Sequence, residues 1–362
     1  MGWSFRIGKI AGIEFRIHVT FFLLLLVIFV STTTQAGMQK AWLATLFISA
    51  VFVCVLIHEI GHSLIARRFG KEAKSITLLP IGGVASLEEI PEKPGQEIAM
   101  AVVGPLINLA IAGVLYLFVG RWSVSVPSLY PSSATMFFAG LIGVNVWLAI
   151  FNMIPAFPMD GGRVLRGFLA LTMDYVRATA VAVMIGQGIA MFFILFGIFY
   201  NWWLVLIGLF LYIGAGGEKR HVMLRSVLRQ VPASEAMTTK YFSLHPDDQL
   251  SRALEQFAHG CQDDFPVIGD HGIEGILTRQ QILAGIYERG LDVAVADLMD
   301  RSVDVVRPET ALDEIYKQLQ QNGKSAVVVA EGDSVKGMIC LDSLSRFILA
   351  KSAVGRLSSH PG

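Results

Sequence analysis

Six apolar stretches dominate the first two thirds of the chain. Of the 362 residues, 54% are hydrophobic and only 16% are charged, which is typical of membrane proteins. About 20 apolar residues in a helix cross a bilayer core roughly 30 Å thick. A chain in lipid must satisfy its backbone polar groups internally, so these stretches predict transmembrane helices. They cover residues 19–34, 42–66, 97–120, 134–155, 176–199 and 201–217.

Lysine and arginine are divided unevenly between the two sets of segments that flank these stretches. One set carries only Lys40 and Arg121. The other carries Arg6, Lys9, Arg16, Arg67, Arg68, Lys71, Lys74, Lys93, Arg163, Arg166, Arg177, Lys219, Arg220, Arg225 and Arg229. Positive charge accumulates on the cytoplasmic side, so we expect both termini and the 67–96 loop in the cytoplasm. The net charge is zero, and no basic field argues for a nucleic-acid partner.

The second apolar stretch ends in the sequence HEIGH, at residues 58–62. Residues four apart share one face of a helix, so His58 and His62 can reach a single metal ion. Glu59 can then act as general base on the water that the metal activates. Zinc suits this place because it compensates charge at membrane depth and lowers the pKa of water towards neutrality. A chance match, or a polar cluster between helices, is the alternative.

A catalytic zinc site uses three protein ligands and leaves the fourth position open. The strongest candidate for the third ligand is Asp160, in NMIPAFPMDGGRVLRG. Two prolines break the fourth apolar stretch. Gly161 and Gly162 permit an unusual turn, which would present the carboxylate at the cytoplasmic end of the broken helix. The alternative role of Asp160 is to cap a helix that begins near Arg163.

Two further stretches fit the same site. Asn108, in VVGPLINLAIAG, lies within the third apolar stretch. Its amide could stabilise an oxyanion or bind the substrate backbone, and a hydrogen bond between helices is the competing role. Residues 78–90, LLPIGGVASLEEI, predict two strands with Gly82 and Gly83 at their turn. This hairpin could pair with an extended substrate, or it could be a plain cytosolic hairpin.

The composition changes from about residue 230, where apolar runs shorten and acidic residues become frequent. Helix-like and strand-like stretches alternate there, which predicts a soluble cytosolic domain. This region also contains an internal repeat. Met237 and Met299 keep the same offset of 62 residues as Gly275 and Gly337. Two copies of one β-α-β-β-α unit are the simplest explanation.

Taken together, the motifs of the apolar region resemble the site-2 protease family of intramembrane zinc metalloproteases. The matching pieces are HEIGH, GPLIN, NMIPAFPMDGG and the opening FRIGKIAGIEFRIHVTF. The resemblance implies one zinc ion per chain, a base, and two asparagines near the substrate. His58, His62 and Asp160 would bind the zinc ion. Glu59 would be the base, and Asn108 and Asn152 would lie near the substrate. It also implies cleavage, in the inner membrane, of a membrane-anchored regulator such as an anti-sigma or pro-sigma factor.

The tail resembles a tandem pair of cystathionine-β-synthase (CBS) domains, which would regulate the enzyme, form a homodimer or dock the substrate. The expected fold is therefore a polytopic α-helical membrane protein with about six transmembrane helices, followed by an α/β tandem CBS pair. The expected domains are 1–225 for the protease, 230–290 and 291–352 for the two repeats, and 353–362 for a flexible tail.

One departure from the CBS pattern concerns adenine nucleotides. Repeats that bind them commonly end the last strand in Thr or Ser, with Asp three residues later to hold the ribose. The first copy has Thr278 but Gln281, and the second has Cys340 with Asp342 one place early. An adenine nucleotide is therefore the weaker expectation for the pair, and dimerisation or substrate docking is the stronger one.

A CBS-regulated metal-ion channel or transporter is the rival function from another class. Such a protein needs a continuous polar route across the membrane and has no need of a catalytic glutamate. The polar groups of this chain instead cluster near one predicted membrane face. An inactive adaptor is disfavoured, because none of the expected catalytic positions is substituted.

Overall fold

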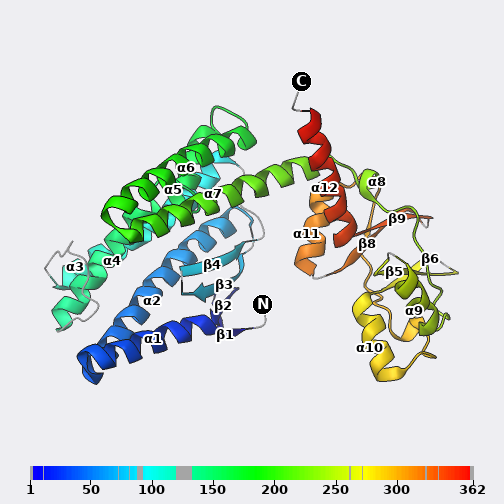
Figure 1. The fold of residues 1–362 in the computed structure, drawn as a ribbon, viewed down its shortest axis with the longest axis horizontal. Helices are drawn as coiled ribbons and strands as arrows, with labels where there is room; N and C mark the ends of the chain where they lie inside the picture. The colour runs from blue at the N-terminus through cyan, green and yellow to red at the C-terminus, as the bar shows by residue number, and fades with distance from the viewer. Residues whose placement is uncertain are drawn as a thin grey trace. The chain divides into compact units, whose positions relative to one another are not determined.

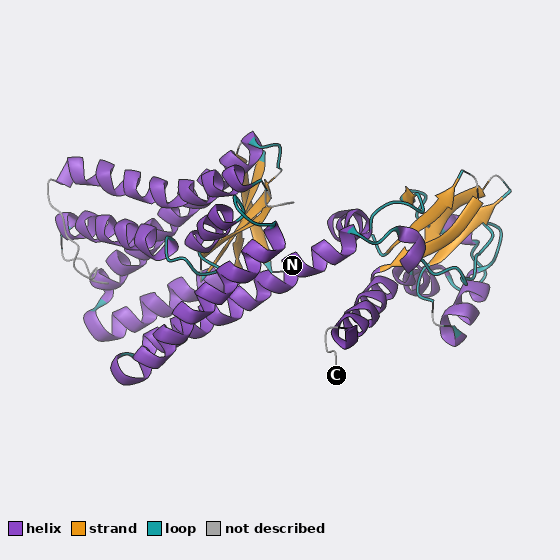
Figure 2. Cartoon of the chain, turned by 90° about the horizontal axis from the view of Figure 1, so that it is seen from above, coloured by secondary structure: helices purple, strands orange, loops and turns teal. Residues whose placement is uncertain are grey.

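The computed structural model divides the chain into two compact units, Met1–Val222 and Met223–Gly362. The first unit consists mainly of long helices with one sheet, and the second mixes short strands and helices (Figures 1 and 2). The structure describes residues 3–10, 12–71, 73–80, 82–87, 93–119, 133–260, 262–270, 272–322, 324–332 and 334–358.

Five helices among the described residues are long and apolar enough to cross a membrane. They correspond to the first five predicted spans and confirm a polytopic helical region. Only 11% to 33% of the residues in their most apolar windows are buried inside the protein, as expected where apolar side chains face lipid. The helices are α1 Val19–Ala36, α2 Met38–Arg68, α3 Pro94–Val119, α4 Ala134–Asn152 and α6 Tyr175–Tyr200.

The sixth predicted span, 201–217, differs from the other five. It forms the first half of a longer helix, α7 (Trp202–Arg229), and α7 is not among the five apolar helices. The physical reason is that Glu218, Lys219 and Arg220 follow the apolar run at once, so that a window of membrane length includes charge. A crossing by α7 therefore stays a prediction.

A four-stranded sheet lies beside the C-terminal half of α2 (Figure 1). Its outer pairs are antiparallel hairpins, and the second and third strands pair in parallel. Ile13, Phe15 and Ile76 of the sheet pack against Leu56 and Ile60 of α2. The sequence analysis predicted a hairpin at residues 78–90 but not its pairing with the N-terminal strands. The strands, in sheet order, are β1 Ser4–Ile10, β2 Ile13–His18, β3 Ala73–Leu79 and β4 Gly82–Leu87, and residues 88–90 of the predicted hairpin lie outside the described residues.

A short helix, α5 (Asp160–Leu169), follows a non-helical link over residues 153–159. The two glycines after Asp160 are helical, so the unusual turn expected from them is wrong. Their role is close approach instead. A Cβ added to Gly161 would lie 2.3 Å from the Ile154 oxygen, and one added to Gly162 would lie 2.7 Å from the Phe157 nitrogen. Glycine therefore lets the start of α5 pack directly on the link.

The second unit contains both copies of the predicted repeat. Two isolated β-bridges join the copies: Thr238 of the first pairs with Met338 of the second, and Asp300 of the second pairs with Ile276 of the first. These two bridges are related by the repeat offset. The elements are α8 Ala233–Ala236, α9 Leu250–His259, β5 Phe265–Gly269, β6 Gly272–Leu277, α10 Arg279–Arg289, the 3-10 turn Val295–Asp297, β7 Val305–Val306, α11 Leu312–Asn322, β8 Ala326–Glu331, β9 Ser334–Cys340 and α12 Leu341–Ser358.

The C-terminal segment departs from the flexible tail expected over residues 353–362. Helix α12 continues to Ser358, and residues 359–362 lie outside the described part of the chain. Leu344 anchors the start of α12 in the core of the unit. Extending a helix that already exists is much easier than starting one, which accounts for the extra turns.

Candidate metal centre

Helix α2 brings His58 and His62 together. The two residues lie one turn apart on the same face, and their Nε2 atoms are 3.0 Å apart. Both residues are buried, with relative exposures of 4% and 5%. Ile60, between them in sequence, packs against the sheet instead. The helix therefore presents both imidazoles to the protein interior and turns an apolar face towards the sheet.

Asp160, the first residue of α5, completes a triangle with the two histidines. Its Oδ2 atom lies 3.3 Å from Nε2 of His58 and 3.3 Å from Nε2 of His62. Sequence analysis named these three residues, and the structure brings them together although the third comes from a distant segment. They form a group whose ligand atoms could hold a metal ion.

The surroundings of the triangle fit a zinc ion. Ligand atoms around tetrahedral zinc are roughly 3.3 Å apart when the bonds are 2.0–2.1 Å long, which is close to the spacing found. His62 Nδ1 donates to the Met100 carbonyl oxygen at 2.7 Å, so Nε2 keeps a lone pair for a metal. Gly104 of α3 lies against the imidazoles, and an added Cβ would be 2.4 Å from His62 Nε2. Glycine thus leaves the space that a ligand set requires.

Glu59 lies beside the first residues of β4. A Cβ added to Gly83 would be 2.7 Å from Cγ of Glu59, so the β4 backbone passes directly over this side chain. Gly82 has a φ of 136°, a conformation that favours glycine. Strand β4 forms one edge of the sheet in the described part of the chain. The two glycines predicted at the hairpin turn thus begin strand β4 instead, and Gly83 lies next to the predicted base.

The two predicted asparagines occupy different environments. Asn108 lies one turn after Gly104 on α3 and is 1% exposed. Within the described residues, neither its amide nitrogen nor its amide oxygen has a hydrogen-bond partner. Leaving such groups unpaired is costly, which marks Asn108 as a residue retained for more than packing. Asn152 is the last residue of α4 and begins the link that leads to Asp160.

Comparison with known proteins matches both parts of the chain. Profiles for peptidase family M50 and for the CBS domain match residues 46–197, and residues 233–288 and 295–350, respectively. A zinc metalloprotease from Methanocaldococcus jannaschii is 33% identical over 347 residues, covering 96% of each chain. The chain belongs to peptidase family M50. Stage IV sporulation protein FB of Bacillus subtilis is 24% identical over 62% of this chain and 76% of that protein. The solved site-2 protease of M. jannaschii is 36% identical over 60% of this chain and 95% of that one, with a TM-score of 0.45.

Membership of family M50 confirms three predictions made from the sequence. The chain is a site-2-type zinc metallopeptidase, it is an integral membrane protein, and it carries a tandem CBS pair. The name of the M. jannaschii relative also makes zinc the metal that this site is expected to hold.

In the CBS pair, the residues at the positions that commonly hold a ribose bond to one another, which the sequence did not predict. Thr278 and Gln281 form a capping box at the start of α10. Cys340 and Ser343 bond to one another in the same manner in the second copy. A cleft of about 930 Å³ borders both boxes. Its lining includes the aspartates Asp263, Asp264, Asp300, Asp304 and Asp342.

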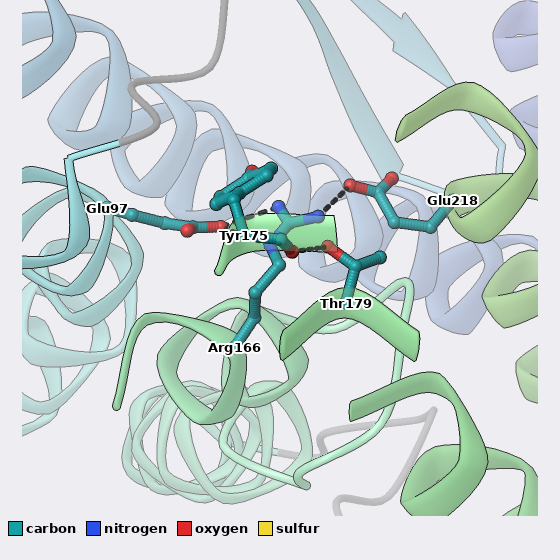
Figure 3. A network of polar contacts seen from close by, with 5 residues as sticks. All are labelled: Glu97, Arg166, Tyr175, Thr179 and Glu218. Atoms are coloured by element: carbon teal, nitrogen blue, oxygen red, sulfur yellow. Dashed lines mark hydrogen bonds and ion pairs between the residues drawn. The ribbon is translucent and has the colours of Figure 1, made fainter. Parts of the chain in front are cut away.

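Sequence analysis missed two features near the metal triangle. Gly104 was quoted within a motif but given no role, although it stands four residues before Asn108 on the same helix face. Arg166 was counted among the flanking charges, and its burial in an ionic cluster was not predicted. The residue is fully buried against Glu97 and Glu218 (Figure 3). The available signal was Glu97 itself, an acid at the end of a predicted span.

Proposed function

We propose that this M50 peptidase hydrolyses a peptide bond in or near a transmembrane segment of a membrane-anchored regulatory protein. The observation that carries the proposal is the triangle of His58, His62 and Asp160 at one end of a helix long enough to span a membrane. Such a triangle supplies the three protein ligands of a catalytic zinc site and leaves one position open.

Bound zinc would supply Lewis-acid chemistry, lowering the pKa of water and polarising the scissile carbonyl. Glu59 performs the proton transfers. Its carboxylate takes a proton from the attacking water as the water oxygen bonds to the carbonyl carbon. Glu59 then returns that proton to the leaving nitrogen as the carbon–nitrogen bond breaks. Each cleavage consumes one water and forms a new carboxyl group and a new amine.

A substrate helix must unwind before cleavage, because its carbonyls are engaged in its own hydrogen bonds. Strand β4, at the edge of the sheet among the described residues, would compensate the lost bonds by pairing with the unwound segment. Gly82 and Gly83 lie at the start of this strand, beside Glu59. Asn108, with its unpaired amide, and Asn152 are the candidate substrate-binding side chains. This geometry supports one path for the substrate, along β4 and past the base.

The CBS pair serves regulation, homodimerisation or substrate docking in this proposal. The mutual capping of Thr278 and Gln281 occupies the groups that would hold a ribose. The five aspartates that line the cleft also outnumber its two cations, Arg279 and Lys324, which opposes a phosphate-bearing ligand. Dimerisation or docking is therefore favoured over an adenine nucleotide. The proposed domains remain 1–225, 230–290 and 291–352.

The substrate class and location follow from the relatives and from charge. Stage IV sporulation protein FB is named for a developmental process, which supports a regulatory substrate such as an anti-sigma or pro-sigma factor. The uneven distribution of lysine and arginine supports an inner-membrane protein with both termini and the CBS pair in the cytoplasm.

The test places the full chain in liposomes with a membrane-spanning substrate and compares wild type with Glu59→Gln. We expect wild type to cleave and Glu59→Gln to lose cleavage while keeping its zinc and its fold. Glu288→Gln, at an exposed position of α10, is the matched control and should cleave normally. Metal flux that survives Glu59→Gln in liposomes, without cleavage by wild type, would instead indicate a transporter.

A further inference from the structure

A buried ionic cluster lies at the far end of the helix that carries Asp160. Arg166 of α5 is 0% exposed, although arginine is almost never fully buried without partners. Its Nε and Nη2 atoms lie 2.7 and 2.5 Å from Oε1 of Glu97, which is also 0% exposed. Its Nη1 donates to Glu218 at 2.6 Å. Figure 3 shows the two carboxylates approaching the guanidinium from opposite sides.

Two aromatic rings complete the enclosure of the guanidinium. Its central carbon lies 4.9 Å from the ring centre of Phe157 and 4.8 Å from that of Tyr175. Thr179 donates to the Tyr175 carbonyl oxygen at 2.8 Å, within the first turn of α6 (Figure 3). Cation–π contacts strengthen when water is excluded. Two carboxylates and two aromatic rings therefore surround the Arg166 guanidinium.

Two partners of Arg166, Phe157 and Glu97, belong to segments that position the metal triangle. Phe157 lies in the link, three residues before Asp160. Glu97 lies on α3, one turn before Met100, whose carbonyl oxygen orients His62. One guanidinium thus connects the helix of the carboxylate ligand, the link that precedes it and the helix behind the histidine ligand.

The chemistry of the cluster indicates that it fixes the geometry of its neighbours rather than stabilising the fold. Burying charges costs free energy that their attraction need not recover, and replacing such clusters with apolar residues is often neutral or stabilising. Here one guanidinium faces two carboxylates, and Oε2 of Glu97 has no hydrogen-bond partner among the described residues. A planar guanidinium with donors fixed in a fork holds several partners in one geometry, which an apolar contact does not.

We propose that Arg166 is a positioning residue that, through Glu97, Glu218 and Phe157, fixes Asp160 against the two histidines. The inference rests on the proposed function only in taking Asp160 as a metal ligand. Arg166 contacts neither metal nor substrate. Removing the cluster should therefore make the geometry of the three ligands less fixed, although all three residues are still present.

The main test is the double variant Arg166→Gln with Glu97→Gln, prepared as the full chain. It removes both fully buried charges of the cluster; Glu218, which loses its partner, is 21% exposed and can be solvated. We expect a thermal midpoint close to that of wild type and a zinc affinity, measured by chelator competition, about 10- to 100-fold weaker. Visible absorption of the Co²⁺-loaded protein should also change, because it reports the geometry of the ligands.

Three further variants make the result decisive. Arg177→Gln removes an 83% exposed arginine side chain paired with Asp174, and it should leave zinc affinity and the Co²⁺ spectrum unchanged. Glu218→Gln keeps the Arg166–Glu97 pair and alters a side chain that is already 21% exposed, so it should fold. We expect a smaller loss of zinc affinity in the same direction. Arg166→Lys, which keeps the charge but not the fork, should recover only part of the wild-type affinity.

Wild-type zinc affinity and an unchanged Co²⁺ spectrum in the folded double variant would overturn the proposal. If that variant does not fold, the same result in Glu218→Gln would overturn it. These measurements need no substrate. A protein that binds zinc but cleaves nothing would contradict the proposed function alone, whereas intact zinc binding without the cluster would contradict the positioning role alone.

Discussion

Polar side chains in the two units differ in what they are arranged around. In the first unit, polar groups from distant segments converge, as His58, His62 and Asp160 do. In the second unit, polar side chains pair with one another instead: Asp313 pairs with Arg229, and Thr278 and Gln281 cap the start of α10. Polar groups that converge without pairing locally are costly and mark chemistry. Paired groups of this kind stabilise the fold, so we expect catalysis in the first unit and support or regulation in the second.

Filling the space beside the histidines should break the convergence in the first unit. Gly104→Ala places a Cβ 2.4 Å from His62 Nε2, which forces the imidazoles away from Asp160. We expect zinc to leave the chain and cleavage to fall below detection. Gly113→Ala on the same helix is the control, since its Cβ meets nothing within 4 Å. Metal analysis of the purified variants checks this, and equal zinc content in both would contradict it.

Damage to the second unit should separate stability from chemistry. Leu250 is fully buried in the apolar core of the first CBS repeat. Leu250→Ala should destabilise this unit by about 2–5 kcal/mol, because it removes buried methyl groups and leaves a cavity. Denaturant unfolding measures this loss, and zinc content should stay at the wild-type level. A parallel loss of zinc would mean that the metal site depends on the CBS core.

A substitution in the capping box should have the smallest effect of the three, and only on the second unit. Thr278→Ala removes a helix cap and should lower the stability of the second unit by about 1 kcal/mol. Adding AMP or ATP should shift the thermal midpoint of neither wild type nor this variant, because the ribose-holding groups are engaged in capping. A nucleotide-dependent rise in the wild-type midpoint that Thr278→Ala abolishes would show that the box does bind nucleotide.

The sequence predicted the metal triangle because its signals are local. His58 and His62 are four apart on a helix, and Asp160 follows a proline-broken stretch. The cluster around Arg166 was not predictable in the same way. Glu97 and Glu218 approach it from helices far along the chain, and no local spacing pairs them. The parallel pairing of β2 with β3 escaped prediction for the same reason, since strand patterns give pairing only within a hairpin.

The most direct test compares zinc content and substrate cleavage in Asp160→Asn and Glu59→Gln, two single-atom exchanges at neighbouring positions of one site. Asp160→Asn should lose both zinc and cleavage, because the amide is a poor zinc ligand. Glu59→Gln should keep zinc and lose cleavage, because the amide cannot accept the proton of the attacking water. Normal cleavage by Glu59→Gln, or wild-type zinc affinity in Asp160→Asn, would contradict the assignment of base and ligand.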